Sequence, residues 1–205
     1  YMFAWAGQNS TEFNIGNLAN WDTSSVTVMN DMFKETGNDV TNLSLDLSGW
    51  DVSAVTTMEN MFQNTGYNST TFSIGNLDNW NPINVTTMKQ MFRGTGRNTT
   101  LFSIGDISTW NVSNVTDMSY MFYDAGYTSE VFSLGNIGGW TLDSSTADMS
   151  YMFYKAGYTA PTWYVGDLGG WDASGVTSFT YMFYQAGYNA TEFNLGTLGN
   201  WNVSS

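Results

Sequence analysis

The sequence predicts a repeat solenoid with a parallel β-sheet on one side and short helices on the other, in about seven units of about 30 residues. Two markers recur in phase along the chain. The dipeptide Met-Phe begins at Met2, Met32, Met61, Met91, Met121, Met152 and Met182, and a tryptophan recurs at the same interval. Within a unit, apolar residues first recur at every second position, as in a strand, and then at every third or fourth position, as in a helix. Each unit therefore reads as one strand and one short helix.

We expect residues 1–205 to form one solenoid domain. The approximate units are 1–30, 31–59, 60–89, 90–119, 120–150, 151–180 and 181–205. The repetition is close enough that DMSYMFYDAGY at 117–127 returns as DMSYMFYKAGY at 148–158. Because the chain opens in the helix phase, we also expect it to be a segment of a longer repeat protein.

The strand element is clearest in TFSIGNL at Thr71–Leu77. Phe72 and Ile74 are two residues apart, which places both on one face of a strand. The second unit, which is the shortest, has LSLDLSGW at Leu43–Trp50, with Leu43, Leu45 and Leu47 in strict alternation. We therefore expect the other units to carry one extra residue, taken up as a bulge at a glycine such as Gly75.

The helix element is clearest in VTDMSYMFYDAG at Val115–Gly126. Val115, Met118 and Phe122 have the spacing of one helical face. Ser113 or Thr116 could cap its start, and Gly126 could close it in the left-handed conformation. Such a helix has only about two to three turns and needs neighbouring units to hold it.

Stacking of units buries the apolar face that a single unit leaves exposed. We expect the recurring tryptophans and the phenylalanines of Met-Phe to form this structural core. The tryptophans are Trp21, Trp50, Trp80, Trp110, Trp140, Trp171 and Trp201, and the phenylalanines are Phe33, Phe62, Phe92, Phe122, Phe153 and Phe183.

The charge and composition exclude several classes of function. The chain has 18 acidic and 5 basic residues, a net charge of −13, and neither Cys nor His. Few cations are available to neutralise phosphates, so we expect no nucleic-acid partner. No apolar run approaches 18 residues, so we expect no insertion of this segment into a membrane. Without Cys or His, disulfides and the commonest metal ligands and general bases are absent. We expect no catalytic residue, no metal site, no cofactor and no enzymatic activity. A glycosidase that uses two carboxylates is a distant alternative.

Polar residues also recur after each strand and after each tryptophan. Asn and Asp at these places are suited to bonding the backbone of turns, and the alternative is a calcium site. The N-x-S/T triplets begin at Asn9, Asn42, Asn68, Asn84, Asn98, Asn111, Asn114, Asn189 and Asn202. We attribute them to the composition of the repeat, and glycan attachment is the alternative.

Tyrosine enrichment is confined to the later units, whereas the core pattern runs through the whole chain. A feature that varies while the core persists favours a surface position, and tyrosine suits protein or glycan recognition. The alternative is that these rings line the seams between units. The candidate binding stripe consists of Tyr120, Tyr123, Tyr127, Tyr151, Tyr154, Tyr158, Tyr181, Tyr184 and Tyr188.

The segments LSLDLSGWDVSAVTTMENMF at Leu43–Phe62 and WNVSNVTDMSYMF at Trp110–Phe122 resemble the BspA-like leucine-rich repeats of bacterial surface proteins. The resemblance extends over every unit. It implies a leucine-rich-repeat-like solenoid, an extracellular or cell-surface location, and adhesion to a protein or glycan of a host or neighbouring cell. The repeat here is longer than the commoner family units. Ser145 and Phe179 also depart from the pattern.

These observations favour a cell-surface repeat scaffold for adhesion or ligand binding. The alternative is a structural spacer, or a fibre-forming subunit that assembles end to end through the apolar ends of the stack.

Overall fold

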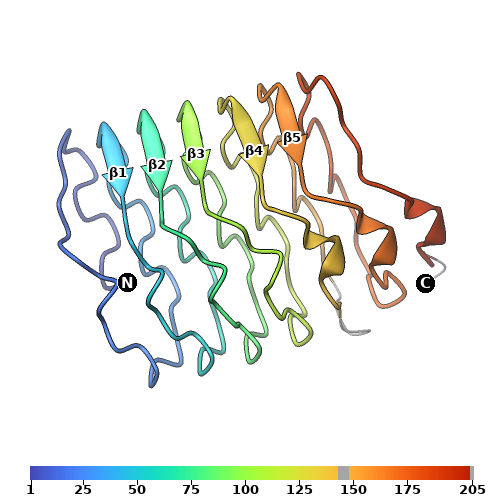
Figure 1. The fold of residues 1–205 in the computed structure, drawn as a ribbon, viewed down its shortest axis with the longest axis horizontal. Coiled ribbons are helices and arrows are strands. Elements are labelled where there is room, and N and C mark those ends of the chain that lie inside the picture. The colour runs from blue at the N-terminus through green and yellow to red at the C-terminus, as the bar shows by residue number, and fades with distance from the viewer. Residues whose placement is uncertain (143–147, 204–205) are drawn as a thin grey trace.

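A computed structural model describes residues 1–142 and 148–203. The backbone runs around a closed outline once per sequence unit, and each circuit is here named a coil. Successive coils lie side by side from the N- to the C-terminal end (Figure 1). Ser145, one of the departures from the repeat pattern, lies outside the described residues.

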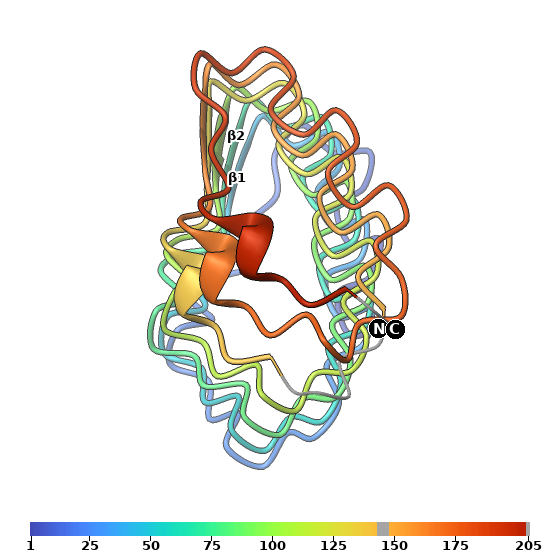
Figure 2. The ribbon, with the colours of Figure 1, turned by 90° about the vertical axis from the view of Figure 1, so that its right-hand side faces the viewer.

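Each coil has little regular secondary structure. The strands are β1 (Asn42–Ser44), β2 (Thr71–Ser73), β3 (Leu101–Ser103), β4 (Val131–Ser133) and β5 (Thr162–Tyr164). The short 3₁₀ helices are η1 (Ile137–Gly139), η2 (Leu168–Gly170) and η3 (Leu198–Asn200). Seen along the stacking direction, the coils superimpose, with the strands on one long side and a scalloped run of turns on the other (Figure 2).

The strands pair in parallel with the equivalent residues of the next unit. Phe72 lies opposite both Leu43 and Phe102, and the middle residue of each strand is buried. The strands form two groups, β1-β2-β3 and β4-β5. Gly75 has a φ of 82° and follows the end of β2, so the extra residue lies in a bend after the strand. The bend therefore occurs at the predicted glycine, but it comes directly after the paired strand and not inside it.

The helix predicted at Val115–Gly126 is wrong. From Asp117 to Gly126 the chain forms consecutive turns, and Tyr120 and Asp124 have φ values of 59° and 55°. Backbone N–H groups alternate between two kinds of partner. Those of Tyr120 and Phe122 donate to the next coil at 2.9 and 2.8 Å, whereas that of Met121 closes a turn at 3.2 Å. The segments of each coil equivalent to 117–126 are named the turn ribbon.

The spacing between coils explains why the turn ribbon replaces a helix. Paired strands lie about 4.8 Å apart, whereas packed helices need about 8–10 Å. On the turn-ribbon side, the rings of Phe92 and Phe122 stack with centroids 5.4 Å apart. A helix does not fit in this interval. Alternate hydrogen bonds to the next coil let the ribbon keep the same close spacing as the strands.

Aromatic columns run through the core along the stacking direction. The indoles of Trp80 and Trp110 stack at 5.9 Å, and the Nε1–H of Trp110 donates to the carbonyl of Leu77 at 2.9 Å. Most of the predicted core residues are buried. Trp21 is 37% exposed, and Phe183 and Trp201 are only partly buried. The core assignment is therefore wrong for Trp21 and incomplete for the other two, because the coils at the ends have a neighbour on one side only.

Candidate functional site

The predicted tyrosine stripe lies on the turn ribbon and at the residue directly after it, and its members are brought together as three ladders. Each ladder takes one tyrosine from each of three successive coils, and together they are named the tyrosine array. The ladders are Tyr120–Tyr151–Tyr181, Tyr123–Tyr154–Tyr184 and Tyr127–Tyr158–Tyr188. The array arises because the ribbon repeats at the ring-stacking distance.

The rings of a ladder cover one another. Tyr123 and Tyr154 stack at 4.6 Å with an interplanar angle of 3°, and Tyr154 and Tyr184 stack at 5.0 Å. The inner rings are consequently half-buried, and their faces are covered by neighbouring rings. The rings of the last coil are more open, with Tyr181, Tyr184 and Tyr188 exposed by 54%, 44% and 62%. Both predicted alternatives therefore hold in part: the inner rings line seams and the outer ones are surface residues.

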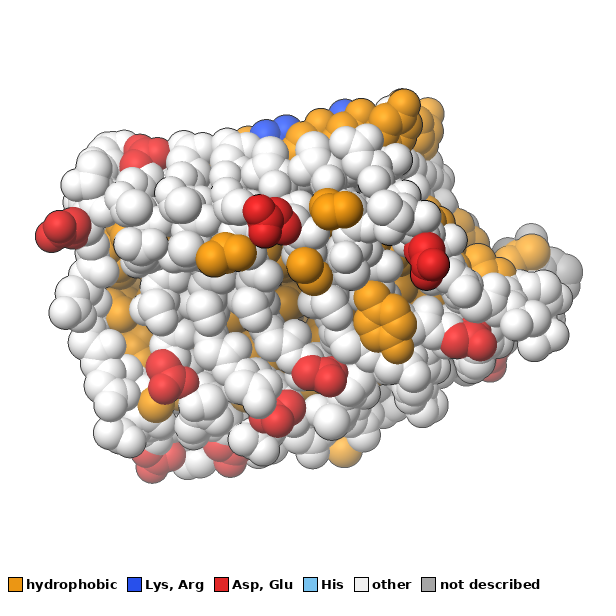
Figure 3. All heavy atoms as spheres, turned by 45° about the horizontal axis from the view of Figure 1, so that its top comes forward, with side chains coloured by type: hydrophobic (Ala, Val, Ile, Leu, Met, Phe, Trp, Pro, Cys, Tyr) orange, Lys and Arg blue, Asp and Glu red, His pale blue; other side chains and the backbone are white. Residues whose placement is uncertain are grey.

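All five basic residues of the chain lie in the turn ribbon or directly after it: Lys34, Lys89, Arg93, Arg97 and Lys155. In Figure 3, Lys and Arg side chains appear only along the upper edge, beside hydrophobic side chains, whereas Asp and Glu side chains are scattered over the front. The turn ribbon is therefore the one side of this acidic chain that carries cations.

The arginines are part of the array. The guanidinium of Arg97 lies between the rings of Tyr67 and Tyr127, at 5.7 and 4.4 Å from their centroids. It also donates to Asp124 Oδ2 at 3.1 Å. Burial lowers the pKa of Arg97, but hydrogen bonding and attraction to Asp124 outweigh it, so the net shift is upward. Arg93 lies 5.3 Å from the ring centroid of Tyr123. Cation–π contacts of this kind hold a guanidinium flat against a ring.

The phenol group of Tyr123 remains a hydrogen-bond donor at neutral pH. Burial raises the pKa of Tyr123, and the Asp124 carboxylate raises it further. Half-covered rings with outward edges can make polar contacts through these hydroxyls. The arrangement offers hydrogen bonds and cations on a rigid surface, and no nucleophile paired with a base.

The recurring Asn and Asp residues bond the turns, as the sequence predicts. Asp46 Oδ1 accepts from the N–H and the hydroxyl of Ser48 at 3.1 and 2.6 Å, and these bonds lower the pKa of Asp46. Within the described residues, no group of three or more Asp or Glu is placed to hold a metal ion. Two of the predicted N-x-S/T asparagines, Asn84 and Asn114, donate to carbonyls of the preceding coil.

One feature of the surface was not predicted from the sequence. A groove of about 420 Å³ crosses the outer face of the sheet, and Leu101 and Val131 border it. They are 57% and 48% exposed. The alternation in the sequence could have indicated this surface, because both residues occupy outward positions next to the buried middle residue of a strand. In the part of the chain that is described, no helix is both long enough and apolar enough to span a bilayer.

Comparison with known proteins places the chain in a family. No curated protein and no solved structure matches it significantly. The model of a family described as "Mycoplasma protein of unknown function, DUF285" matches three overlapping stretches, residues 1–100, 39–161 and 65–187. Overlapping matches are expected when a repeat sequence can align in more than one register. Together they cover well over half of the chain, which therefore belongs to this family.

Proposed function

We propose that the chain is a non-enzymatic scaffold of the cell surface, built as a leucine-rich-repeat-like solenoid, and that it binds an extracellular protein or glycan through the tyrosine array. The resemblance to BspA-like repeats supports the surface location and the adhesive role. The hypothesis of a carboxylate glycosidase gains no support, because the acidic residues follow the repeat and no pair stands apart.

The observation that carries this proposal is the coincidence of tyrosines and arginines on one side of the molecule. Tyrosine and arginine are enriched in protein interfaces and among the residues that dominate binding energy. The tyrosine ladders occupy only three coils, whereas the aromatic core columns continue through the others. Packing of the fold therefore does not require the array.

The ring geometry favours recognition through hydroxyl groups over stacking of sugars on ring faces. Sugars stack on an open aromatic face, and the faces of Tyr123 and Tyr154 are covered within their ladder. Hydroxyls and ring edges remain, and they suit the polar groups of a protein surface.

The test replaces hydroxyl groups without disturbing the ladders. In the triple variant Tyr123→Phe, Tyr154→Phe and Tyr184→Phe, one ladder keeps its rings and loses its donors. The control is Tyr164→Phe, which makes the same change on the sheet side, where Tyr164 is 48% exposed. Both proteins and the wild type are assayed by surface plasmon resonance against collagen, laminin and a mammalian glycan array.

We expect the wild type and the control to bind at least one of these probes, and the triple variant to bind it about tenfold more weakly, as losing two or three hydrogen bonds predicts. Equal binding by the triple variant, a loss confined to the control, or no binding by the wild type would each contradict the proposal.

A second candidate, end-to-end assembly, is favoured by an apolar hollow of about 480 Å³ on the last coil. Phe179, Phe183 and Trp201 line this hollow. Glu12 and Glu192 occupy equivalent positions of the first and last repeats, so stacked copies would bring two carboxylates together. Assembly of this kind would strengthen with salt. Sedimentation velocity at low and high salt tests it, and a single species of constant size at every concentration refutes it.

A further inference from the structure

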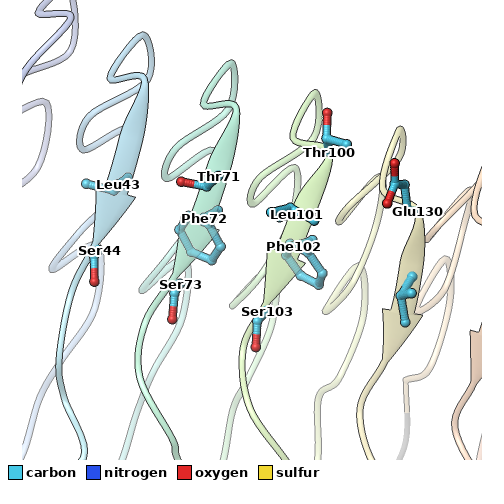
Figure 4. A pocket seen from close by; sticks show the side chains of 11 residues that line it. Leu43, Ser44, Thr71, Phe72, Ser73, Thr100, Leu101, Phe102, Ser103 and Glu130 are labelled. Carbon is cyan, nitrogen blue, oxygen red and sulfur yellow. The ribbon is translucent and has the colours of Figure 1, made fainter.

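The groove on the sheet side has an apolar wall and a row of small polar groups. Ser44, Ser73 and Ser103 lie at the same end of three neighbouring strands, and Glu130 lies beside Thr100 near the other end (Figure 4). The serines leave space along their row because their side chains are small. The groove therefore runs across the strands, along the stacking direction.

The floor of the groove exposes part of the core beside β3. The assigned strand ladder stops between β3 and β4, but the coils stay hydrogen-bonded there, because the N–H of Glu130 donates to the carbonyl of Thr100 at 3.1 Å. Phe102, in the middle of β3, is 9% exposed, whereas its neighbours in the aromatic column are more completely buried. Part of the aromatic core is thus reachable from outside at this junction, next to the exposed side chains of Leu101 and Val131.

The charge around the groove has one sign. Glu130 is part of its lining, and all five basic residues lie on or next to the turn ribbon. With a net charge of −13, the sheet side attracts cationic groups and repels anionic ones. Apolar lining combined with acidic charge selects a partner that is apolar and basic.

We propose that this groove binds an extended segment of a partner protein in which a large apolar side chain is flanked by Lys or Arg. The apolar side chain enters the hollow over Phe102 between Leu101 and Val131, and the flanking cation pairs with Glu130. The segment lies across the strands, because the groove has that direction. This site is separate from the tyrosine array and does not depend on the function proposed for it.

A defined peptide tests the proposal. The probe is a fluorescein-labelled, blocked peptide Gly-Lys-Phe-Lys-Gly, with Gly-Glu-Phe-Glu-Gly and Gly-Lys-Ser-Lys-Gly as matched peptides. Fluorescence polarisation measures binding, and amide shifts in an NMR spectrum of the labelled chain locate it. We expect the Lys-Phe-Lys peptide alone to bind, with salt-dependent affinity, and to shift the amides of Leu101–Ser103 and Glu130.

Variants separate charge from apolar contact. Glu130→Gln should weaken binding about two- to fivefold and reduce its salt dependence, as expected for one exposed ion pair. Leu101→Ser should weaken it about fivefold through lost apolar contact. Asp78→Asn makes the same charge change on an exposed residue outside the groove and should leave affinity unchanged.

The proposal is overturned if the peptide fails to bind, if Glu130→Gln and Asp78→Asn reduce its affinity equally, or if the shifted amides lie elsewhere. The triple phenylalanine variant of the tyrosine array should bind the peptide normally. Failure of one site is therefore distinguishable from failure of the other. Binding of neutral glycans at the same amides, without the peptide, would assign the groove to a different class of ligand and reject this proposal.

Discussion

Replacing Gly126 by alanine tests whether the turn ribbon has the conformation described above. Gly126 has a φ of 52°, and a Cβ built on it would lie 2.9 Å from Cδ1 and 3.0 Å from Cγ of Phe102. Phe102 has little room to move, because its ring stacks between Phe72 and Phe132 at 5.9 and 5.8 Å. The methyl group therefore meets a side chain that is held on both faces.

The expected loss of stability combines two costs. A left-handed alanine costs about 1–2 kcal/mol. Overpacking a filled core costs about 1–3 kcal/mol. Alanine also restricts the unfolded chain more than glycine does, which offsets about 0.4–1 kcal/mol of this loss. Gly126→Ala should therefore lower the free energy of unfolding by about 2–4 kcal/mol. With a urea dependence of about 2 kcal/mol per M, the unfolding midpoint should fall by about 1–2 M.

The assay is urea unfolding followed by tryptophan fluorescence, with Gly139→Ala as the control. A Cβ added to Gly139 would have no atom within 4 Å, and Gly139 has no positive φ, so alanine there should be neutral or slightly stabilising. If Gly126→Ala shifted the midpoint no more than Gly139→Ala, neither the left-handed backbone nor the contact with Phe102 could be correct.

Three further predictions follow from particular contacts. Thr95 is buried, and its hydroxyl donates to the carbonyl of Phe62 at 2.6 Å. Thr95→Val should cost about 1 kcal/mol in urea unfolding, because the carbonyl of Phe62 loses its donor while the side chain keeps its size. A valine variant as stable as the wild type would show that this bond contributes nothing. Asp46 has a pKa lowered below its ordinary value of 3.8 by its bonds to Ser48. The ionised Asp46 side chain makes its full contribution to the free energy of unfolding above pH 3.8. That contribution is lost as the pH falls through the lower pKa that Asp46 has in the folded state. Asp46→Asn should therefore flatten the dependence of stability on pH below about pH 4, and an unchanged slope would contradict the assignment. Arg97→Lys removes a planar group from between two tyrosine rings and should lower stability by about 0.5–1 kcal/mol, measured by thermal unfolding, with no change expected if the ring contacts are incidental.

Much of the organisation could be read from side-chain spacing. The unit length follows from the Met-Phe and tryptophan markers, and the inward residues of the strands follow from alternation around Phe72. The candidate tyrosines could also be selected, because their enrichment departs from the repeat. Burial at the ends of the stack could not be predicted, since Trp21 has the same sequence context as the buried tryptophans and differs only in its number of neighbouring coils.

The helix was mispredicted for a physical reason. Met118, Met121 and Phe122 have the three- and four-residue spacing of a helical face, and a ribbon of turns produces the same inward positions. Single-sequence spacing cannot separate the two, because the difference lies in hydrogen bonds to another coil. The groove was missed, although Leu101 and Val131 occupy outward strand positions, because it also depends on which side chains of neighbouring coils come to lie side by side.

The sequence by itself determined the period of the repeat, the composition of the aromatic columns and the segregation of the basic residues, because these depend only on which residues recur at which interval. The tertiary structure alone decided that the second half of each unit is a turn ribbon and that the tyrosines stack into ladders. Both follow from the spacing between coils. Strand pairing sets that spacing at about 5 Å, which is too narrow for helices and suited to stacked rings.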